Sequence, residues 1–159
     1  MKKIKNIFAA IILCGVVFST TFVSCSAKED EPVTPAAKSI EGVYHGDMTS
    51  SVMGSESVIE DVMLTVAATD DATASITVSS FGEPPMQVAS ITIPGIAVSG
   101  DDGVYTLATT AFSGTTDTGK AYSGTAQGSF ADNRLTLQWN LTYGAMPMPM
   151  IFTFSALKE

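Results

Sequence analysis

The feature that most constrains the fold of this chain is a strict alternation of apolar and polar residues between Arg134 and Tyr143. Every second residue there is leucine, tryptophan or tyrosine, and the residues between them are threonine, glutamine or asparagine. Successive side chains of a β-strand point to opposite faces, whereas an α-helix would scatter these apolar residues around its circumference. The segment is therefore predicted to be a β-strand with one buried and one solvated face.

The same alternation, interrupted by turn signals, continues from Ser39 to Glu159, where no amphipathic helix is predicted. The predicted strands cover residues 40–48, 57–68, 72–80, 86–93 with 96–98, 104–110, 120–131, 134–143 and 149–157. Eight consecutive strands with mostly short connections predict an all-β fold, an eight-stranded up-and-down antiparallel barrel over residues 39–159. A Greek-key sandwich is the open alternative. It needs a long crossover, for which only residues 49–56 and 113–119 are available.

The composition excludes several classes of protein. Hydrophobic residues make up 45% of the 159 residues and charged residues only 15%, which argues against a disordered chain. The net charge of −8 argues against a nucleic-acid partner, because such a partner requires a basic surface. The polar faces of most predicted strands carry threonine, serine, glutamine and asparagine, so the barrel lacks the lipid-facing apolar band of a membrane-spanning one.

The N-terminus has the order of a secretory signal, with a basic start, an apolar run over residues 7–17 and small or polar residues up to Ser24. A retained transmembrane helix is disfavoured, because spanning a bilayer takes roughly 20 apolar residues. The segment ending at Cys25 resembles a bacterial lipoprotein signal, although Phe22 replaces the usual leucine. The resemblance implies a signal peptide over residues 1–24 and lipidation of Cys25. A cleaved soluble protein with a free thiol is the alternative.

Residues 25–38 are predicted to form a flexible acidic and proline-containing tether, because they are polar and have no period. Residues 28–31 resemble the acidic stretch that Bacteroidetes lipoproteins use for transfer to the cell surface, and a solvated charge run is the alternative. Loss of residues 1–24 removes three lysines and changes the net charge from −8 to −11. Anionic headgroups repel such a surface. The predicted membrane contact is therefore the lipid, in an outer membrane lipoprotein of the cell envelope facing either the periplasm or the cell surface.

Short motifs spread over residues 39–159 carry a family resemblance. They are GVYHG at 42–46, ITIPGI at 91–96, YSGTAQGSF at 122–130, LTL at 135–137 and IFTF at 151–154. These motifs resemble the calycin-like, or lipocalin-like, lipoproteins of Bacteroidetes, and the resemblance implies a small ligand-holding barrel. The chain differs from true lipocalins at Tyr44, where those proteins carry an early tryptophan. The single cysteine left after signal removal excludes an intramolecular disulfide.

One face of the predicted strand 120–131 carries three small residues between two aromatic ones. Facing inward, these small residues would leave open volume for one ligand. Alternatively, Gly124 and Gly128 permit strand bending or close approach. The inward aromatic residues likewise fit either an ordinary core or an apolar cavity. The candidate ligand-binding residues of the cavity and its mouth are Tyr44, Tyr105, Tyr122, Gly124, Phe130, Trp139, Phe152, Met146, Met148 and Met150.

The most unusual local feature is the alternation of methionine and proline over residues 146–150. Thioethers bind Cu(I) and also form adaptable apolar surfaces, so a copper site, a flexible lip at the barrel mouth and ordinary loop packing are all open. No His or Cys lies nearby to complete a metal site, and none is predicted. Loops 49–56, 81–85, 111–119 and 144–148 share one end of an up-and-down barrel. We place the opening there, with Met53 joining the lip.

The sequence offers no catalytic constellation. His45 is the only histidine and alternates with Tyr44, which predicts a solvated surface position. Glu60 is expected near a barrel end, in water. We therefore predict neither an enzyme nor a cofactor. The predicted protein is a lipid-anchored extracytoplasmic barrel that binds a small hydrophobic ligand. One alternative is a non-enzymatic surface or structural module with a filled barrel, which contacts protein partners through its loops. The other is a protein that inhibits or protects against another macromolecule through the same loops.

Overall fold

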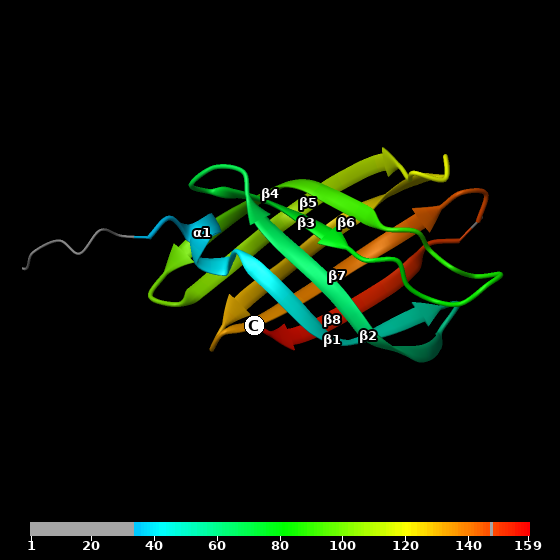
Figure 1. Cartoon of the computed structure of the whole chain (residues 1–159), viewed down its shortest axis with the longest axis horizontal. Helices are drawn as coiled ribbons and strands as arrows, with labels where there is room; N and C mark the ends of the chain where they lie inside the picture. Colours follow the sequence, from blue (N-terminus) through cyan, green and yellow to red (C-terminus); the bar gives the residue numbers. More distant parts are fainter. Residues whose placement is uncertain (1–33, 147) are drawn as a thin grey trace, which may run out of the picture. The chain divides into compact units, whose positions relative to one another are not determined.

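Eight antiparallel strands form a closed barrel in which each strand pairs with its neighbours in sequence (Figure 1). The structure is a computed structural model that describes residues 34–146 and 148–159. The strands are β1 (Gly42–Val52), β2 (Ser55–Ala68), β3 (Thr73–Val78), β4 (Ile91–Asp101), β5 (Val104–Thr115), β6 (Ala121–Ala131), β7 (Arg134–Tyr143) and β8 (Met150–Leu157). Residues 48–51 of β1 pair with residues 151–154 of β8 and close the sheet. The predicted eight-stranded up-and-down barrel is confirmed, and the sandwich alternative is wrong.

The predictions that concern the N-terminus lie largely outside the described residues. The signal peptide 1–24, the lipidation of Cys25 and the acidic stretch 28–31 all precede residue 34 and stay predictions. The described chain begins just before a short helix, α1 (Ala36–Ile40), which the sequence did not predict.

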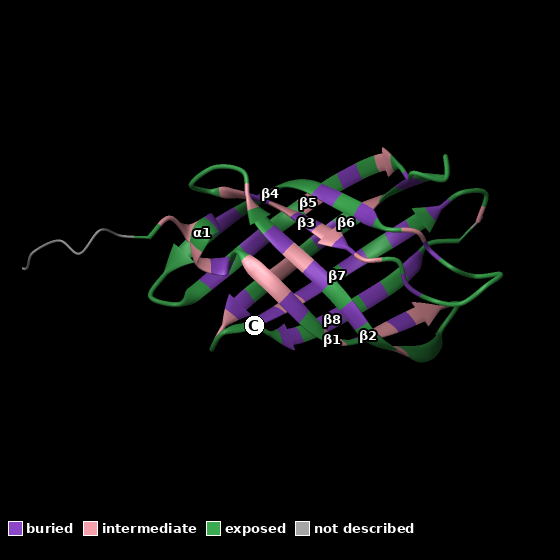
Figure 2. Cartoon of the chain, viewed as in Figure 1, coloured by how far each residue is buried: buried purple, intermediate pink, exposed green. Residues whose placement is uncertain are grey.

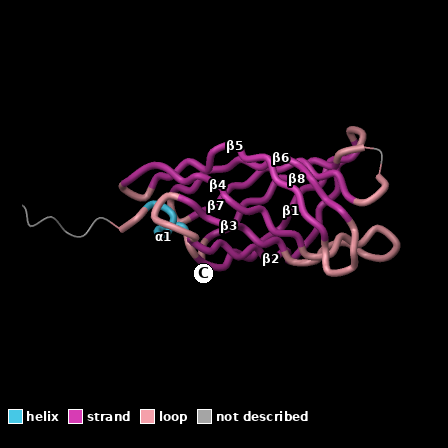
Figure 3. The backbone as a smooth tube through the Cα atoms, turned by 90° about the horizontal axis from the view of Figure 1, so that it is seen from above, coloured by secondary structure: helices cyan, strands magenta, loops and turns pink. Residues whose placement is uncertain are grey.

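Helix α1 closes one end of the barrel (Figures 1 and 3). Ala37 and Ile40 lie three residues apart, so they share one helix face, and both are buried. The Ala37 amide donates to the carbonyl oxygen of Asp71 at 3.2 Å. Lys158 Nζ donates to the carbonyl oxygen of Ser39 at 3.1 Å. Residues 36–38 were predicted to be the end of a flexible tether. They are helical instead, and the helix is held against the barrel because Ala37 and Ile40 are buried there.

The alternation that predicted the barrel sets which side chains fill it. In β7 the residues at 135, 137, 139, 141 and 143 are buried and those between them are exposed or half-buried, and β8 follows the same rhythm (Figure 2). The outer faces of β5 to β8 are lined by threonine, serine, glutamine, asparagine and a few apolar residues. Arg134 is the only charged residue in these four strands.

Strand β2 does not keep one face throughout, although the alternation of its sequence predicts that Val58 and Val62 share a face. Val62 is buried, whereas Val58 is 64% exposed. The pairing of β1 with β2 shifts its register between Gly46 and Met48, and Asp61 adopts a φ of 55°. Such a bulge inserts an extra residue and turns the following side chains to the other face. Glu60 is exposed, as expected, and it lies within β2 beside Asp61.

The fourth strand begins later than predicted. Residues 86–90 were expected to be strand, but β4 begins at Ile91. The preceding residues fold back on themselves instead, because Phe81 and Val88 exchange both backbone hydrogen bonds at 3.0 Å. The result is a long β3–β4 loop, residues 79–90. Conversely, the predicted loop 113–119 is shorter, because residues 113–115 pair with 121–123 and extend β5.

Candidate functional site

The loops after β1, β3, β5 and β7 gather at the end of the barrel opposite α1, which we call the open end (Figures 1 and 3). This is the end at which the sequence placed the opening. The β1–β2 connection is only Met53-Gly54, and both residues have positive φ, at 53° and 81°. Positive φ at both central residues is typical of a two-residue hairpin turn. The longest connection at the open end is the β3–β4 loop.

The β3–β4 loop sends two apolar side chains into the barrel. Phe81 and Val88 are both buried. The Phe81 ring meets the Phe152 ring edge-on, with centroids 5.2 Å apart, and Phe152 stacks on Trp139 with centroids 5.3 Å apart. Because Phe152 belongs to β8 and the loop follows β3, this contact crosses the barrel interior. A side chain from a loop therefore covers an aromatic stack that two strands provide.

The sequence did not predict this role for Phe81. The residue stands at the start of a glycine- and proline-rich segment, where a single aromatic residue carries no period. The available signal was an apolar pair, Phe81 and Val88, flanking a turn-rich stretch. Tyr143 was also missing from the candidate residues. Its hydroxyl accepts a hydrogen bond from the Ala89 amide at 3.1 Å and so fastens the end of the loop to β7.

Three of the candidate residues lie at the closed end, away from the loops. The Tyr44 and Phe130 rings meet edge-on with centroids 6.4 Å apart, and the Tyr105 and Phe130 centroids are 6.1 Å apart. The Tyr44 hydroxyl donates to the Ile40 carbonyl oxygen at 2.5 Å. Burial raises the pKa of Tyr44 from 10.0 to about 12. Their contacts tie these side chains to one another and to α1.

Gly124 brings β6 close to its neighbour. A Cβ added there would lie 1.9 Å from the backbone oxygen of Asn140 and 2.9 Å from Cζ of Phe112. At Gly128 an added Cβ would lie 2.5 Å from the backbone oxygen of Thr136. The two glycines therefore permit close approach, the alternative raised for them above, and Phe112 occupies the space beside Gly124.

Tyr122 bridges a gap in the strand pairing of the open half of the barrel. Residues 98–101 of β4 pair with residues 104–107 of β5, and the two strands separate toward the open end. The Tyr122 hydroxyl donates to the Thr92 carbonyl oxygen at 3.1 Å and accepts from the Thr92 amide at 3.2 Å. The Tyr122 side chain of β6 thus provides hydrogen bonds to backbone groups of β4 that do not pair with β5.

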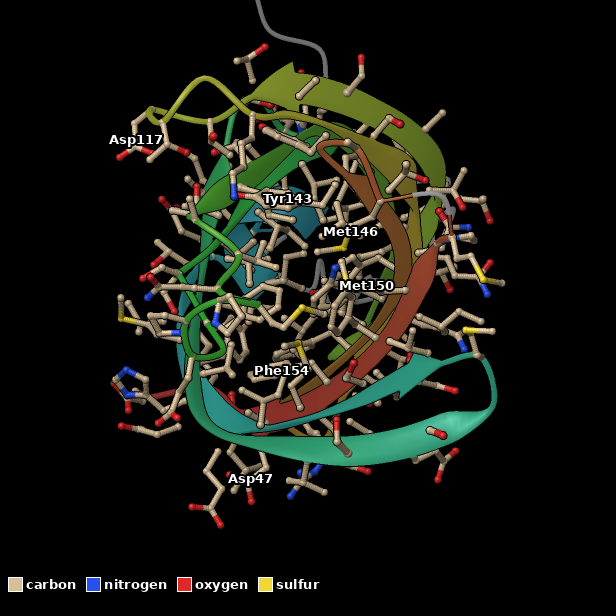
Figure 4. All side chains as sticks on the ribbon, turned by 90° about the vertical axis from the view of Figure 1, so that its right-hand side faces the viewer. Asp47, Asp117, Tyr143, Met146, Met150 and Phe154 are labelled. Atoms are coloured by element: carbon tan, nitrogen blue, oxygen red, sulfur yellow. The ribbon has the colours of Figure 1, made fainter. Side chains whose placement is uncertain are left out.

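The methionines of the open end fall into an inner and an outer group. Met150 is buried and Met146 is half-buried against the core, and both lie within the ring of strands in Figure 4. Met53, Met86 and Met148 are 78%, 63% and 43% exposed and stand on three different loops. We call these three exposed residues the methionine rim. Met53 and Met148 belong to the predicted apolar lip, which stays a prediction, and Met86 is an addition to it.

The open end carries several polar side chains, among them Gln87, Asp117 and Thr118. Lys120 Nζ lies 5.3 Å from the centre of the Tyr143 ring, beside a groove between the β3–β4 and β5–β6 loops. Over residues 34–146 and 148–159, no group of three or more His, Cys, Asp or Glu side chains is placed to hold a metal ion. His45 is exposed, as predicted, and its Nδ1 lies 2.6 Å from Oε1 of Glu159. In the same part of the chain no helix is long and apolar enough to cross a membrane.

Among the described residues, Trp139 carries a buried side-chain nitrogen, Nε1, without a hydrogen-bond partner. The side chain is 1% exposed. An indole N–H can only donate. Leaving such a donor buried and unpaired costs about 1–3 kcal/mol.

Comparison with known proteins agrees with this architecture. The model of the calycin-like beta-barrel domain matches residues 40–156. The chain belongs to the calycin-like beta-barrel family. No curated protein matches the sequence of this calycin-like chain.

A crystal structure from Bacteroides fragilis NCTC 9343, of a protein provisionally named an outer membrane protein, has the same fold. The TM-score is 0.68 at 18% identity, and the match covers 79% of this calycin-like chain. It covers 53% of that chain, so the similarity spans about half of the Bacteroides protein and concerns the fold alone.

Proposed function

We propose that this calycin-like barrel binds a small apolar ligand in its open half, beneath the β3–β4 loop, and catalyses no reaction. The observation that carries the proposal is the aromatic stack of Trp139 and Phe152, which Phe81 of that loop covers. Calycin-like families are typically binding proteins. Entry of a ligand requires displacement of one loop side chain, and the strands of the barrel stay paired.

The energetics of this exchange support reversible binding. Exposing a buried phenylalanine side chain costs about 1.5–3 kcal/mol. An apolar ligand that takes the place of Phe81 against Phe152 recovers a similar burial of apolar surface. Met146 and Met150 line the same end, and unbranched thioether side chains adapt to ligands of different outline. The methionine rim extends this adaptable surface outward.

We further propose that the barrel is held at the outer membrane by lipid on Cys25. The basic, apolar and small regions that end at Cys25 support this, as does the provisional outer membrane name of the Bacteroides protein. The described chain begins beside α1, at the closed end. An anchor at Cys25 is therefore connected to the barrel at the end away from the opening.

Fluorescence of Trp139 tests the binding proposal, because it is the only tryptophan in the chain. The uncharged probe N-phenylnaphthylamine absorbs where tryptophan emits, so a probe held against Phe152 quenches Trp139 by energy transfer. We expect saturable quenching together with enhanced probe emission. Linear quenching without saturation would contradict a defined site.

The filled-barrel module remains the second candidate, and the outer face of β5 to β8 favours it. Shallow grooves there are lined by uncharged polar residues such as Thr125, Gln127 and Gln138. A face with Arg134 as its one charged residue, on so acidic a chain, suits a largely neutral protein surface. A module of this kind would refuse the probe, and Gln127→Lys would abolish partner binding whereas Glu60→Lys would not.

A further inference from the structure

The indole N–H of Trp139 is an exception among the buried polar groups of the barrel. The hydroxyls of Tyr44, Tyr122 and Tyr143 each have a hydrogen-bond partner. Trp139 Nε1 has none within residues 34–146 and 148–159. Buried donors in folded proteins are almost always paired, so an unpaired one points to a partner outside the chain.

The position of Trp139 places this donor within the proposed binding site. The residue lies midway along β7, on its inward face, and pairs with Ala126 of β6 and Phe152 of β8. Alanine is a small neighbour for a tryptophan. On the other side the indole stacks on Phe152, which Phe81 covers. The loop movement that admits an apolar ligand thus uncovers the stack to which the donor belongs.

The absence of charged side chains among the described buried residues restricts the chemical group that can accept a hydrogen bond from Trp139 Nε1. In the part of the chain that the structure describes, the buried side chains include no charged group, and Ser50 and Thr116 are the polar ones besides the aromatic residues. An ionised carboxylate held beside Trp139 would lack a cation, and burying an unpaired charge is strongly unfavourable. Lys120, the cation of the open end, lies over Tyr143 instead.

We propose that the ligand carries an uncharged carbonyl oxygen, as in a ketone or ester, which accepts the hydrogen bond of Trp139 Nε1. This inference rests on the proposed function and deepens it, because it names the polar group of an otherwise apolar ligand. The apolar part of the ligand lies against Phe152 and the methionines of the open end. The carbonyl group sets the orientation of the ligand in the barrel.

A matched pair of probes tests the inference without any variant. Methyl hexyl ketone and its analogue with a methylene group in place of the carbonyl oxygen have nearly the same shape and differ in the acceptor. Chain labelled with ¹⁵N at the indole gives a single indole resonance, because the chain has one tryptophan. We expect the ketone to bind about tenfold more tightly and to move the indole N–H resonance downfield. The hydrocarbon should bind without that downfield shift.

The variant Trp139→Phe supplies the second arm, because it keeps an aromatic ring and removes the donor. It should abolish the preference for the ketone, so that the ratio of ketone to hydrocarbon affinity falls from about ten to about one even if the smaller ring changes both affinities. Equal affinity for the two probes would overturn the inference and leave the proposed function standing. Binding of neither probe would contradict both. A water molecule that keeps its nuclear Overhauser contact to the indole N–H in every complex would also overturn the inference.

Discussion

Replacing Phe81 by alanine separates the stability of the barrel from its capacity to bind. Phe81 is 6% exposed, and its ring packs edge-on against Phe152 at 5.2 Å. Phenylalanine-to-alanine changes in a core cost about 3–5 kcal/mol. Because Phe81 stands on a loop at the open end, where water can enter the vacated space, we expect the lower value, about 3 kcal/mol. For a domain of this size that lowers Tm by roughly 10 °C.

The same change should strengthen ligand binding. In the wild-type chain an entering ligand must first expose Phe81, at a cost of about 1.5–3 kcal/mol. Phe81→Ala removes that cost, so affinity for N-phenylnaphthylamine should rise about ten- to a hundredfold. Titration followed by probe emission, with calorimetric melting of the same samples, measures both quantities.

A matched control lies at the closed end. Leu135 is fully buried and pairs with Phe130, so Leu135→Ala should destabilise the barrel by about 2–5 kcal/mol. It should not raise probe affinity, because the residue is remote from the open end. The account is refuted if Phe81→Ala leaves affinity unchanged, or if Leu135→Ala raises it as much.

Three further predictions concern the fold and the anchor. Gly124→Ala places a Cβ 1.9 Å from the backbone oxygen of Asn140, so it should lower the free energy of unfolding by at least about 1–3 kcal/mol in denaturant titrations, and an unchanged midpoint would contradict the close approach. The pKa of Tyr44 is raised from 10.0 to about 12, so its contribution to stability, of the order of 2–3 kcal/mol, is complete below pH 10 and is lost as the pH rises through 12. Alkaline unfolding of Tyr44→Phe should lack this loss, and an identical pH profile would refute the assignment. Cys25→Ser should release the protein from membranes in cell fractionation, and a variant still sedimenting with membranes would refute the anchor.

The strand pattern was readable from the sequence because each strand has a local period. The alternation of β7 needs no knowledge of its neighbours, and every inward residue it predicted is buried. Helix α1 was missed because five residues are too few to show a helical period. The change of face in β2 was missed because it depends on a bulge at Asp61, which the pairing with β1 creates.

The candidate site was predictable only in part, because its contacts join residues that are remote in sequence. The open end and its methionines follow from the order of the strands. Phe81 joins the site through Phe152, a contact that exists only once the barrel has closed. The unpaired N–H of Trp139 is likewise a property of the packed interior. No local pattern reports which buried donor lacks an acceptor.

The most direct test of ligand binding in the open half is native mass spectrometry of the protein purified from its native cells without denaturation. The account predicts a species heavier than the chain by the mass of one small molecule. Denaturation should remove the extra mass, and excess methyl hexyl ketone should replace it with the mass of the ketone. A bare chain of unchanged mass, which also fails to take up the added ketone, would contradict the account.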